Sequence, residues 1–278
     1  MATADRDHPG GLAALGSPIY TTLVGLGDVS LFAAQTFGWM ARARPYARTL
    51  LPALYLIGVR SVPVVAITGM FIGMVLAVQS YGQFHQLGLA THLGGIINIS
   101  VVRELGPVLT ATMLAGRVGS AMSAELATMR VTEQIDALSC LGANPVRYLV
   151  VPRVLACVLL IPLLTVMANF MGVMGGALIC IRVYHVEAYF YWQHTQTMLS
   201  LWDVVTGLIK PIFFGAAIAI ISCHRGFHSK AGAEGVGRAA TEAFVASFIA
   251  LLALDFFLAM FLNNLYDFLW PANGAKMI

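Results

Sequence analysis

The strongest constraint on this chain is a stretch from Val154 to Ile181 that contains no charged residue. A helix needs about 20 predominantly apolar residues to cross the hydrocarbon core of a membrane, so this stretch predicts one membrane-spanning helix. The composition agrees, because 59% of the 278 residues are hydrophobic and only 10% are charged. Soluble domains usually carry about 25% charged residues, so a water-soluble globular fold is excluded.

Four further stretches have the same apolar character, although each includes or borders a few charged residues. Their bounds are Val62–Val78 with an extension back toward Leu50, Leu93–Gly116, Asp203–Cys223 and Ala243–Tyr266. We therefore expect an all-α integral membrane protein with five membrane-spanning helices in one domain over residues 46–278. Five spans would place the two termini on opposite sides of the membrane.

Residues 1–45 form an N-terminal segment of a different kind. About thirteen uncharged residues lie between Asp28 and Arg42, which is too few to cross a bilayer. Apolar and aromatic residues precede a basic end in this order: Phe32, Phe37, Trp39, Met40, Arg42, Arg44 and Arg48. This pattern is typical of a helix lying in the membrane interface. A tilted sixth span is the alternative.

Basic residues are divided unequally between the two sides of the predicted bundle. Ten fall on one side: Arg42, Arg44, Arg48, Arg117, Arg130, Arg147, Arg153, Arg225, Lys230 and Arg238. Only two, Arg182 and Lys276, fall on the other side. Cytoplasmic loops are enriched in Lys and Arg, so the first side is predicted to be cytoplasmic, with the N-terminus inside and the C-terminus outside.

The sequence lacks the patterns of an ATP-hydrolysing or metal-dependent enzyme. Lys210, Lys230 and Lys276 are the only lysines, and none is part of a glycine-rich phosphate loop. The four cysteines have no metal-ligand spacing, and His85 and His92 lack a third ligand, so we expect no metal site. A net charge of +3 without a basic stripe excludes a nucleic-acid-binding protein.

Arg103 and Glu104 lie near the middle of the second predicted span, directly before a Gly-Pro pair. Ionisable residues inside a bilayer are costly and by default mark a binding site or a pathway. Successive helix positions point about 100° apart, so we expect separate partners and a second helix or subunit. A purely structural ion pair, with Asp255 or Arg60 as partner, is the alternative.

Small residues recur along the predicted spans, most clearly in the Gly69-x-x-x-Gly73 pattern and at Gly172, Gly175 and Gly176. Glycines at this spacing let two helix backbones approach closely. Such a contact can form within one chain or between two copies, and the pattern does not distinguish them.

The segment between the second and third spans concentrates charge in a charge-poor chain. Residues 121–138 contain few helix breakers and predict a short helix lying across the cytoplasmic face. Positions i, i+4, i+7 and i+11 share one face of that helix. They are Glu125, Met129, Thr132 and Asp136. We expect this face to dock another protein, and a solvated charged face is the alternative.

Four sequence blocks carry a family resemblance. They are Gly-Met-Phe-Ile-Gly-Met-Val-Leu-Ala-Val-Gln-Ser-Tyr-Gly at 69–82, Arg-Glu-Leu-Gly-Pro-Val at 103–108, Ala-Gly-Arg-Val-Gly-Ser-Ala at 115–121, and the segment 124–153. Together they resemble the MlaE-type permeases of ABC systems that move phospholipid between the inner and outer membranes, and the related YrbE proteins of Mce systems. The resemblance extends from about Leu50 to Leu262 and is most specific between Arg103 and Arg153.

The resemblance implies an architecture and a set of partners. It implies an interfacial helix, five spans and a cytoplasmic coupling helix over about 121–138, in a permease of the inner membrane. Two permease chains, identical in Mla-type systems and different in Mce-type systems, would sit on cytoplasmic ABC ATPase subunits. A periplasmic MCE-domain ring and a STAS-domain protein are further implied partners. No cofactor is implied in this chain, because ATP and Mg²⁺ would bind the ATPase.

The resemblance also implies roles for particular residues. The lipid-binding pocket at the dimer axis would be formed by Leu76, Phe84, Leu87, Arg103, Glu104 and Leu105. The surface that couples to the ATPase would be formed by Glu125, Met129, Arg130, Glu133 and Asp136. The expected function is a non-enzymatic permease subunit for phospholipid transport that maintains lipid asymmetry. A YrbE-type permease importing other lipids or sterols is the alternative, and a secondary transporter is a more distant one.

Overall fold

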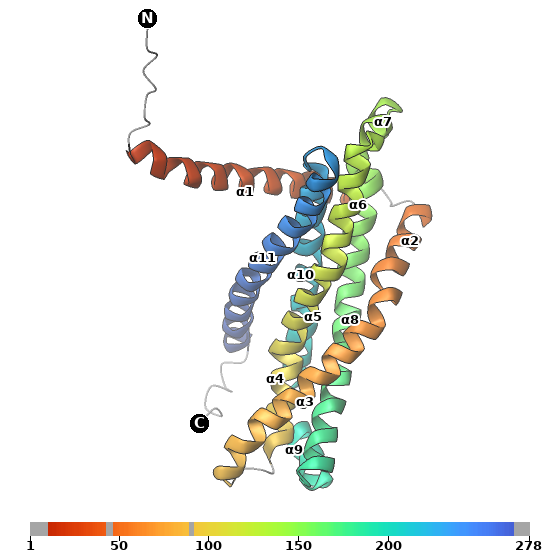
Figure 1. Cartoon of the computed structure of the whole chain (residues 1–278). Helices are drawn as coiled ribbons and strands as arrows, with labels where there is room; N and C mark the ends of the chain where they lie inside the picture. The colour runs from red at the N-terminus through yellow and green to blue at the C-terminus, as the bar shows by residue number, and fades with distance from the viewer. Residues whose placement is uncertain (1–10, 43–46, 89–91, 270–278) are drawn as a thin grey trace, which may run out of the picture.

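The computed structural model describes residues 11–42, 47–88 and 92–269, and these ranges are helical apart from short connections (Figure 1). No β-strand occurs within them. Five helical stretches in this part of the chain are long and apolar enough to cross a membrane: Arg48–Gln86, Leu93–Val131, Val146–Val183, Leu201–Phe227 and Gly232–Leu269. The prediction of an all-α membrane protein with five spans is therefore confirmed.

Most spans are built from several helical segments. The first contains α2 (Ala47–Ile57), η1 (Val59–Ser61) and α3 (Val62–Gln86). The second contains α4 (Leu93–Ser100), η3 (Val101–Leu105), α5 (Gly106–Leu114), η4 (Ala115–Gly119) and α6 (Ser120–Val131). The third contains η5 (Val146–Val150), α8 (Val151–Leu178) and η6 (Ile179–Val183), and the last two are α10 (Leu201–Phe227) and α11 (Gly232–Leu269).

The helix α1 (Gly11–Arg42) is not one of the five spans and projects sideways from one end of the bundle (Figure 1). It begins well before the predicted apolar stretch that follows Asp28. Its Phe32 ring packs edge-on against His224 of α10, and the Arg147 guanidinium lies 5.8 Å from the centre of the Trp39 ring. This arrangement agrees with the interfacial helix that the sequence predicts.

The two ends of the bundle carry different segments (Figure 1). The end that carries α7 (Gln134–Cys140) also carries the start of α2 and the α10–α11 connection, and we call it the α7 end. The opposite end carries α9 (Ala188–Met198) and the end of α3, and we call it the α9 end. Members of all three groups of basic residues that predict the cytoplasmic side lie at the α7 end: Arg48 in α2, Arg130 in α6 and Arg225 in α10.

Glycines bring α3 and α8 into direct backbone contact. A Cβ atom on Gly69 would lie 2.5 Å from the carbonyl oxygen of Ala168, and one on Gly73 would lie 2.9 Å from the Cα atom of Gly172. The helix α3 must therefore lack side chains at these two positions. The Gly69-x-x-x-Gly73 pattern is thus explained by packing within one chain.

The short helix α9 was not predicted from the sequence. Its Tyr191 is completely buried and donates a hydrogen bond of 3.3 Å to Oδ1 of Asn98 in α4. Asn98 in turn donates through Nδ2 to Oγ1 of Thr195, at 2.9 Å. Burial raises the pKa of the Tyr191 phenol, so this side chain stays a neutral donor that holds α9 against the second span.

The predicted single helix over 121–138 is wrong. In the structure α6 continues the second span to Val131, and α7 follows as a separate helix. Glu133 adopts a left-handed conformation with φ 59°, which ends the first helix and redirects the chain. Arg130 forms an ion pair with Asp136 across this turn, so a local contact favours the break.

Candidate functional site

Arg103 and Glu104 lie in η3, a π-helical turn within the second span. Pro107 follows four residues after Arg103 and has no N–H to donate to its carbonyl, so the regular hydrogen-bond ladder is interrupted here. A π-turn in a helix is uncommon and frequently marks a functional site. This local irregularity presents both charged side chains toward α10 and α11.

The two residues belong to a network of charged side chains from three spans. The Arg103 guanidinium donates through Nη1 to Oδ1 of Asp203 in α10, at 3.1 Å, and through Nη2 to Asn263 of α11. Glu104 accepts a hydrogen bond from the Lys210 ammonium of α10. We call these residues, with Asp255 of α11, the ion-pair network.

Lys210 is the centre of the ion-pair network. Its side chain is 0% exposed, and Nζ lies 3.1 Å from Oδ1 of Asp255 while it also pairs with Glu104. A buried ammonium ion is tolerated only when its lost hydration is replaced by such partners. Lys210 therefore connects the second, fourth and fifth spans.

The expectation of separate partners on a second helix or subunit agrees with the structure. Arg103 pairs with Asp203 and Glu104 pairs with Lys210, and these two partners stand seven residues apart on the same face of α10. All these partners belong to the same chain, so no second subunit is needed to pair them. Of the two partners considered from the sequence, Asp255 joins through Lys210, whereas Arg60 is exposed in η1.

Asp203 has a second task that fixes its position. Its Oδ2 accepts hydrogen bonds from the backbone N–H of Ser200 at 3.0 Å and from the Ser200 hydroxyl at 2.6 Å. The Asp203 N–H donates back to Ser200 Oγ, which completes a capping box at the start of α10. One carboxylate oxygen thus caps the helix while the other holds Arg103.

The ion-pair network is not sealed from its surroundings. The Arg103 and Glu104 side chains are 30% and 40% exposed, although both have partners within the chain. Two cations face three carboxylates, so the network carries a formal excess of one negative charge. Because both cations already have carboxylate partners, an anionic ligand can bind Arg103 only if the Arg103 side chain turns away from its carboxylate.

The apolar residues predicted for a lipid pocket remain partly exposed in the single chain. Leu76 and Phe84 pack against a small core cluster near the α9 end that includes Tyr191. Leu87 follows the last turn of α3 and is 69% exposed, and Leu105 is half-buried. Their role in a lipid pocket stays a prediction.

The residues predicted to contact an ATPase divide into two groups. Glu125 pairs with Arg153 of α8 at 2.9 Å, and Met129 is partly buried against the core, so these two stabilise the bundle itself. Arg130, Glu133 and Asp136 are exposed around the α6–α7 turn. The predicted common face of Glu125, Met129 and Asp136 is therefore not continuous.

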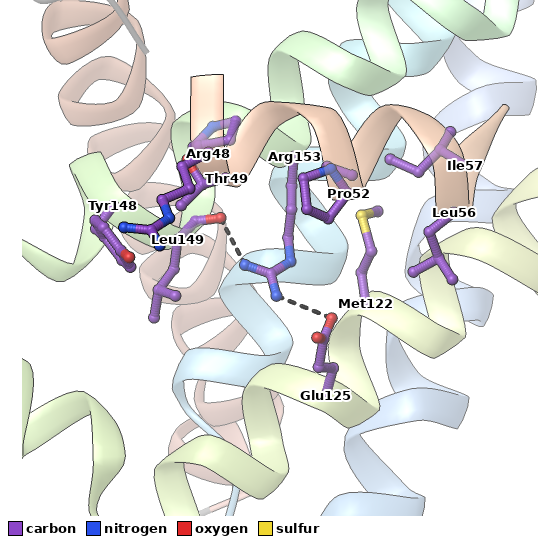
Figure 2. Close-up of a pocket in the computed structure, with 12 residues that line it drawn as sticks. Arg48, Thr49, Pro52, Leu56, Ile57, Met122, Glu125, Tyr148, Leu149 and Arg153 are labelled. Atoms are coloured by element: carbon purple, nitrogen blue, oxygen red, sulfur yellow. Dashed lines mark hydrogen bonds and ion pairs between the residues drawn. The ribbon is translucent and has the colours of Figure 1, made fainter. Parts of the chain in front are cut away.

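Figure 2 shows a cavity of about 270 Å³ beside Glu125, between α2, α6 and the start of the third span. Arg153 donates to the carbonyl of Leu149 at 2.8 Å and pairs with Glu125, while Arg48 lies near the rim (Figure 2). Met122 and Ile57 contribute an apolar wall. The cavity shows that the α7 end offers a recess as well as an exposed turn.

Sequence reasoning missed three members of the ion-pair network. Asp203 only marked the start of the fourth predicted span, Lys210 was considered only as a lysine outside any phosphate loop, and Asn263 was not singled out. The sequence did contain a signal for Lys210. A lysine inside an apolar stretch is costly in free energy, so it requires a carboxylate partner from another helix. The periodicity of a single helix gives no information about which helix supplies that partner.

Comparison with known proteins identifies a single family. The Permease MlaE family matches residues 50–261, which agrees with the range of the sequence resemblance. A probable ABC transporter permease protein of Synechocystis sp. is 43% identical over 225 residues, covering 81% of this chain and 86% of that protein. The chloroplastic protein TRIGALACTOSYLDIACYLGLYCEROL 1 of Arabidopsis thaliana is 38% identical, covering 84% and 67%. The intermembrane phospholipid transport system permease protein MlaE of Haemophilus influenzae is 32% identical over 248 residues, covering 89% and 95%.

Proposed function

The chain belongs to the MlaE permease family, and we propose that it is the membrane-spanning subunit of an ABC transporter that moves phospholipid between two membranes. The observation that carries this proposal is the ion-pair network, which links three spans through the buried Lys210 and leaves Arg103 and Glu104 partly exposed. A buried network that only braced helices would not need to expose two of its charges.

The geometry suggests how the ion-pair network could respond to a lipid. A headgroup phosphate would compete with Asp203 for the planar donor fork of Arg103. Asp203 would keep its capping hydrogen bonds to Ser200, so the exchange need not unwind α10. Acyl chains would lie against apolar side chains such as Leu76 and Leu105. Lipid binding would in this way be coupled to the relative positions of the second and fourth spans.

The remaining components of the transporter belong to other chains. The proposed assembly contains a second permease chain, a cytoplasmic ABC ATPase that binds ATP and Mg²⁺, a periplasmic MCE-domain ring and a STAS-domain protein. The proposed location is the inner membrane, with the α7 end in the cytoplasm. Support for this orientation comes from the count of Lys and Arg in the sequence, ten on the predicted cytoplasmic side against two on the other.

The orientation can be tested with the native cysteines. Cys140 is exposed at the α7 end, whereas Cys157, Cys180 and Cys223 are buried. In spheroplasts a membrane-impermeant maleimide should label a Gln83→Cys variant that also carries Cys140→Ser, because Gln83 is exposed at the α9 end. Native Cys140 should react only after permeabilisation. The reverse pattern would contradict the orientation and the proposed position of the ATPase.

The α6–α7 turn gives a sharper test of ATPase docking than Glu125 or Asp136, which have partners within the chain. Glu133 and Leu141 are exposed, and Leu141 is an apolar side chain with no cover in the described chain. A Glu133→Lys/Leu141→Glu double variant should lower copurification of the ATPase at least tenfold, since lost interface contacts of this kind cost about 2–5 kcal/mol. Glu187→Lys at the α9 end is the matched control and should leave copurification unchanged. Equal copurification of both variants would show that the turn is a solvated surface.

Photocrosslinking tests whether the predicted lipid pocket exists. A crosslinking amino acid at Leu87 or Leu105 should capture phospholipid in the assembled transporter. The comparison position is Phe170, which is 63% exposed on α8 and is expected to face bulk lipid. More lipid at Leu87 and Leu105 than at Phe170 is expected. Equal or greater capture at Phe170, with only protein at the other two positions, would place the cargo elsewhere.

A further inference from the structure

A second polar cavity lies at the α7 end, at the junction of α10 and α11. It has a volume of about 350 Å³ and lies more than three helical turns from Asp255 along α11. Its walls come from the last turn of α10, the following connection and the first turns of α11. Its polar lining residues include His224, Arg225, Ser229, Lys230, Arg238 and Glu242. We call it the junction cavity.

The lining of the junction cavity is predominantly cationic. Arg225, Lys230 and Arg238 carry permanent positive charges, and Glu242 is the single carboxylate among the lining residues. Glu242 is shared, since Oε1 accepts from Arg238 Nε at 2.7 Å and Oε2 lies 3.5 Å from Arg225 Nη1. Lys230 forms no ion pair with any described residue. The cavity thus retains an excess of positive charge.

Three lining side chains also have polar atoms without partners. His224 is only 7% exposed, and neither ring nitrogen is hydrogen-bonded to another described residue. Arg225 Nε and Ser229 Oγ are buried and equally unpaired within the described chain. Buried polar atoms are nearly always hydrogen-bonded, so four unpaired atoms on three side chains around one cationic cavity indicate a ligand that accepts hydrogen bonds.

Packing holds these donors in place. The His224 ring is fixed by an edge contact with Phe32 of α1, at 5.5 Å between centroids, and by His228 at 4.4 Å. Gly235 has no side chain, which lets the backbone of Lys230 fold directly against the first turn of α11. The donors are therefore arranged before any ligand arrives.

We propose that the junction cavity binds a phosphate group, supplied either by the headgroup of a membrane phospholipid or by a soluble phosphate. A phosphate accepts several hydrogen bonds at once and matches the arginine donor geometry. The cavity lies at the ends of two spans and close to Phe32 of α1, the helix predicted to lie at the membrane interface, where lipid headgroups would be within reach. A bound phosphate would join α10 and α11. This inference concerns a site at the bundle's end and does not depend on which cargo the transporter moves.

Binding to the full-length chain, purified in a neutral detergent, tests the proposal. The probes are dioctanoyl phosphatidylglycerol, dioctanoyl phosphatidylcholine and inorganic phosphate, with affinity measured by native mass spectrometry. Lys230→Gln and His224→Phe should each weaken phosphatidylglycerol binding about tenfold, because the first removes a positive charge and the second removes a hydrogen-bond donor to a charged group. His224→Phe keeps the ring contact with Phe32. Arg182→Gln, at the α9 end, is the control and should bind as the wild-type chain does.

The pattern among the probes identifies the source of the phosphate. Binding of either phospholipid at far lower concentration than inorganic phosphate would assign the cavity to a lipid headgroup. Comparable binding of inorganic phosphate would assign it to a soluble anion. The proposal is overturned if no probe binds, or if both variants retain wild-type affinity for phosphatidylglycerol while circular dichroism shows that they are folded.

Discussion

Replacing Lys210 with methionine should destabilise the chain by about 3–5 kcal/mol, the usual cost of removing one partner from a buried ion pair. Lys210 is 0% exposed and lies between the carboxylates of Glu104 and Asp255, which would lose the cation that they share. The free energy of unfolding in detergent micelles measures this loss directly.

The control for this prediction neutralises the whole group. A Glu104→Gln/Lys210→Met/Asp255→Asn triple variant leaves no unpaired charge and preserves the Arg103–Asp203 pair. Its stability should return to within about 1–2 kcal/mol of the wild-type value, since buried ion pairs contribute little net stability compared with neutral replacements. A Lys210→Met variant as stable as the wild type would show that Lys210 is not the cation holding these carboxylates.

The second large effect is expected at Gly73. A Gly73→Leu substitution should cost about 3 kcal/mol or more, because a Cβ atom there would collide with the backbone of Gly172 in α8. Gly82 lies in the same helix, and a Cβ atom on it would have no neighbour within 4 Å. Gly82→Leu is therefore the matched control and should leave the free energy of unfolding nearly unchanged. If the two variants had similar free energies of unfolding, α3 and α8 would not be held together at this crossing.

The sequence predicted the spans well because hydrophobic length is a property of each segment alone. The uncharged stretch from Val154 to Ile181 lies within the third span, and the other four stretches also lie within helices of sufficient length. The short apolar stretch before Arg42 also correctly excluded α1 from the five spans. Each of these features is encoded locally and needs no knowledge of neighbouring helices.

Features that depend on contacts between segments were predicted poorly. Nothing in the pattern from Ala121 to Leu138 signalled the left-handed turn at Glu133, which the Arg130–Asp136 pair favours. The partners of Arg103 and Glu104 were also hidden, because helix periodicity gives a direction around one axis but not the neighbour in that direction. The burial of Lys210 shows why an isolated charge in a span is best treated as half of a pair.

Transport of phospholipid by the reconstituted complex is the most direct test of the proposed function. The measurement is ATP-dependent transfer of a fluorescent phospholipid out of vesicles that contain the permease and its ATPase. The wild-type complex should transfer lipid, and the folded Glu104→Gln/Lys210→Met/Asp255→Asn variant should lose at least nine-tenths of the rate, about 1.4 kcal/mol or more in activation free energy. Absence of transfer by the wild-type complex, or transfer at the wild-type rate by this neutral variant, would contradict the account.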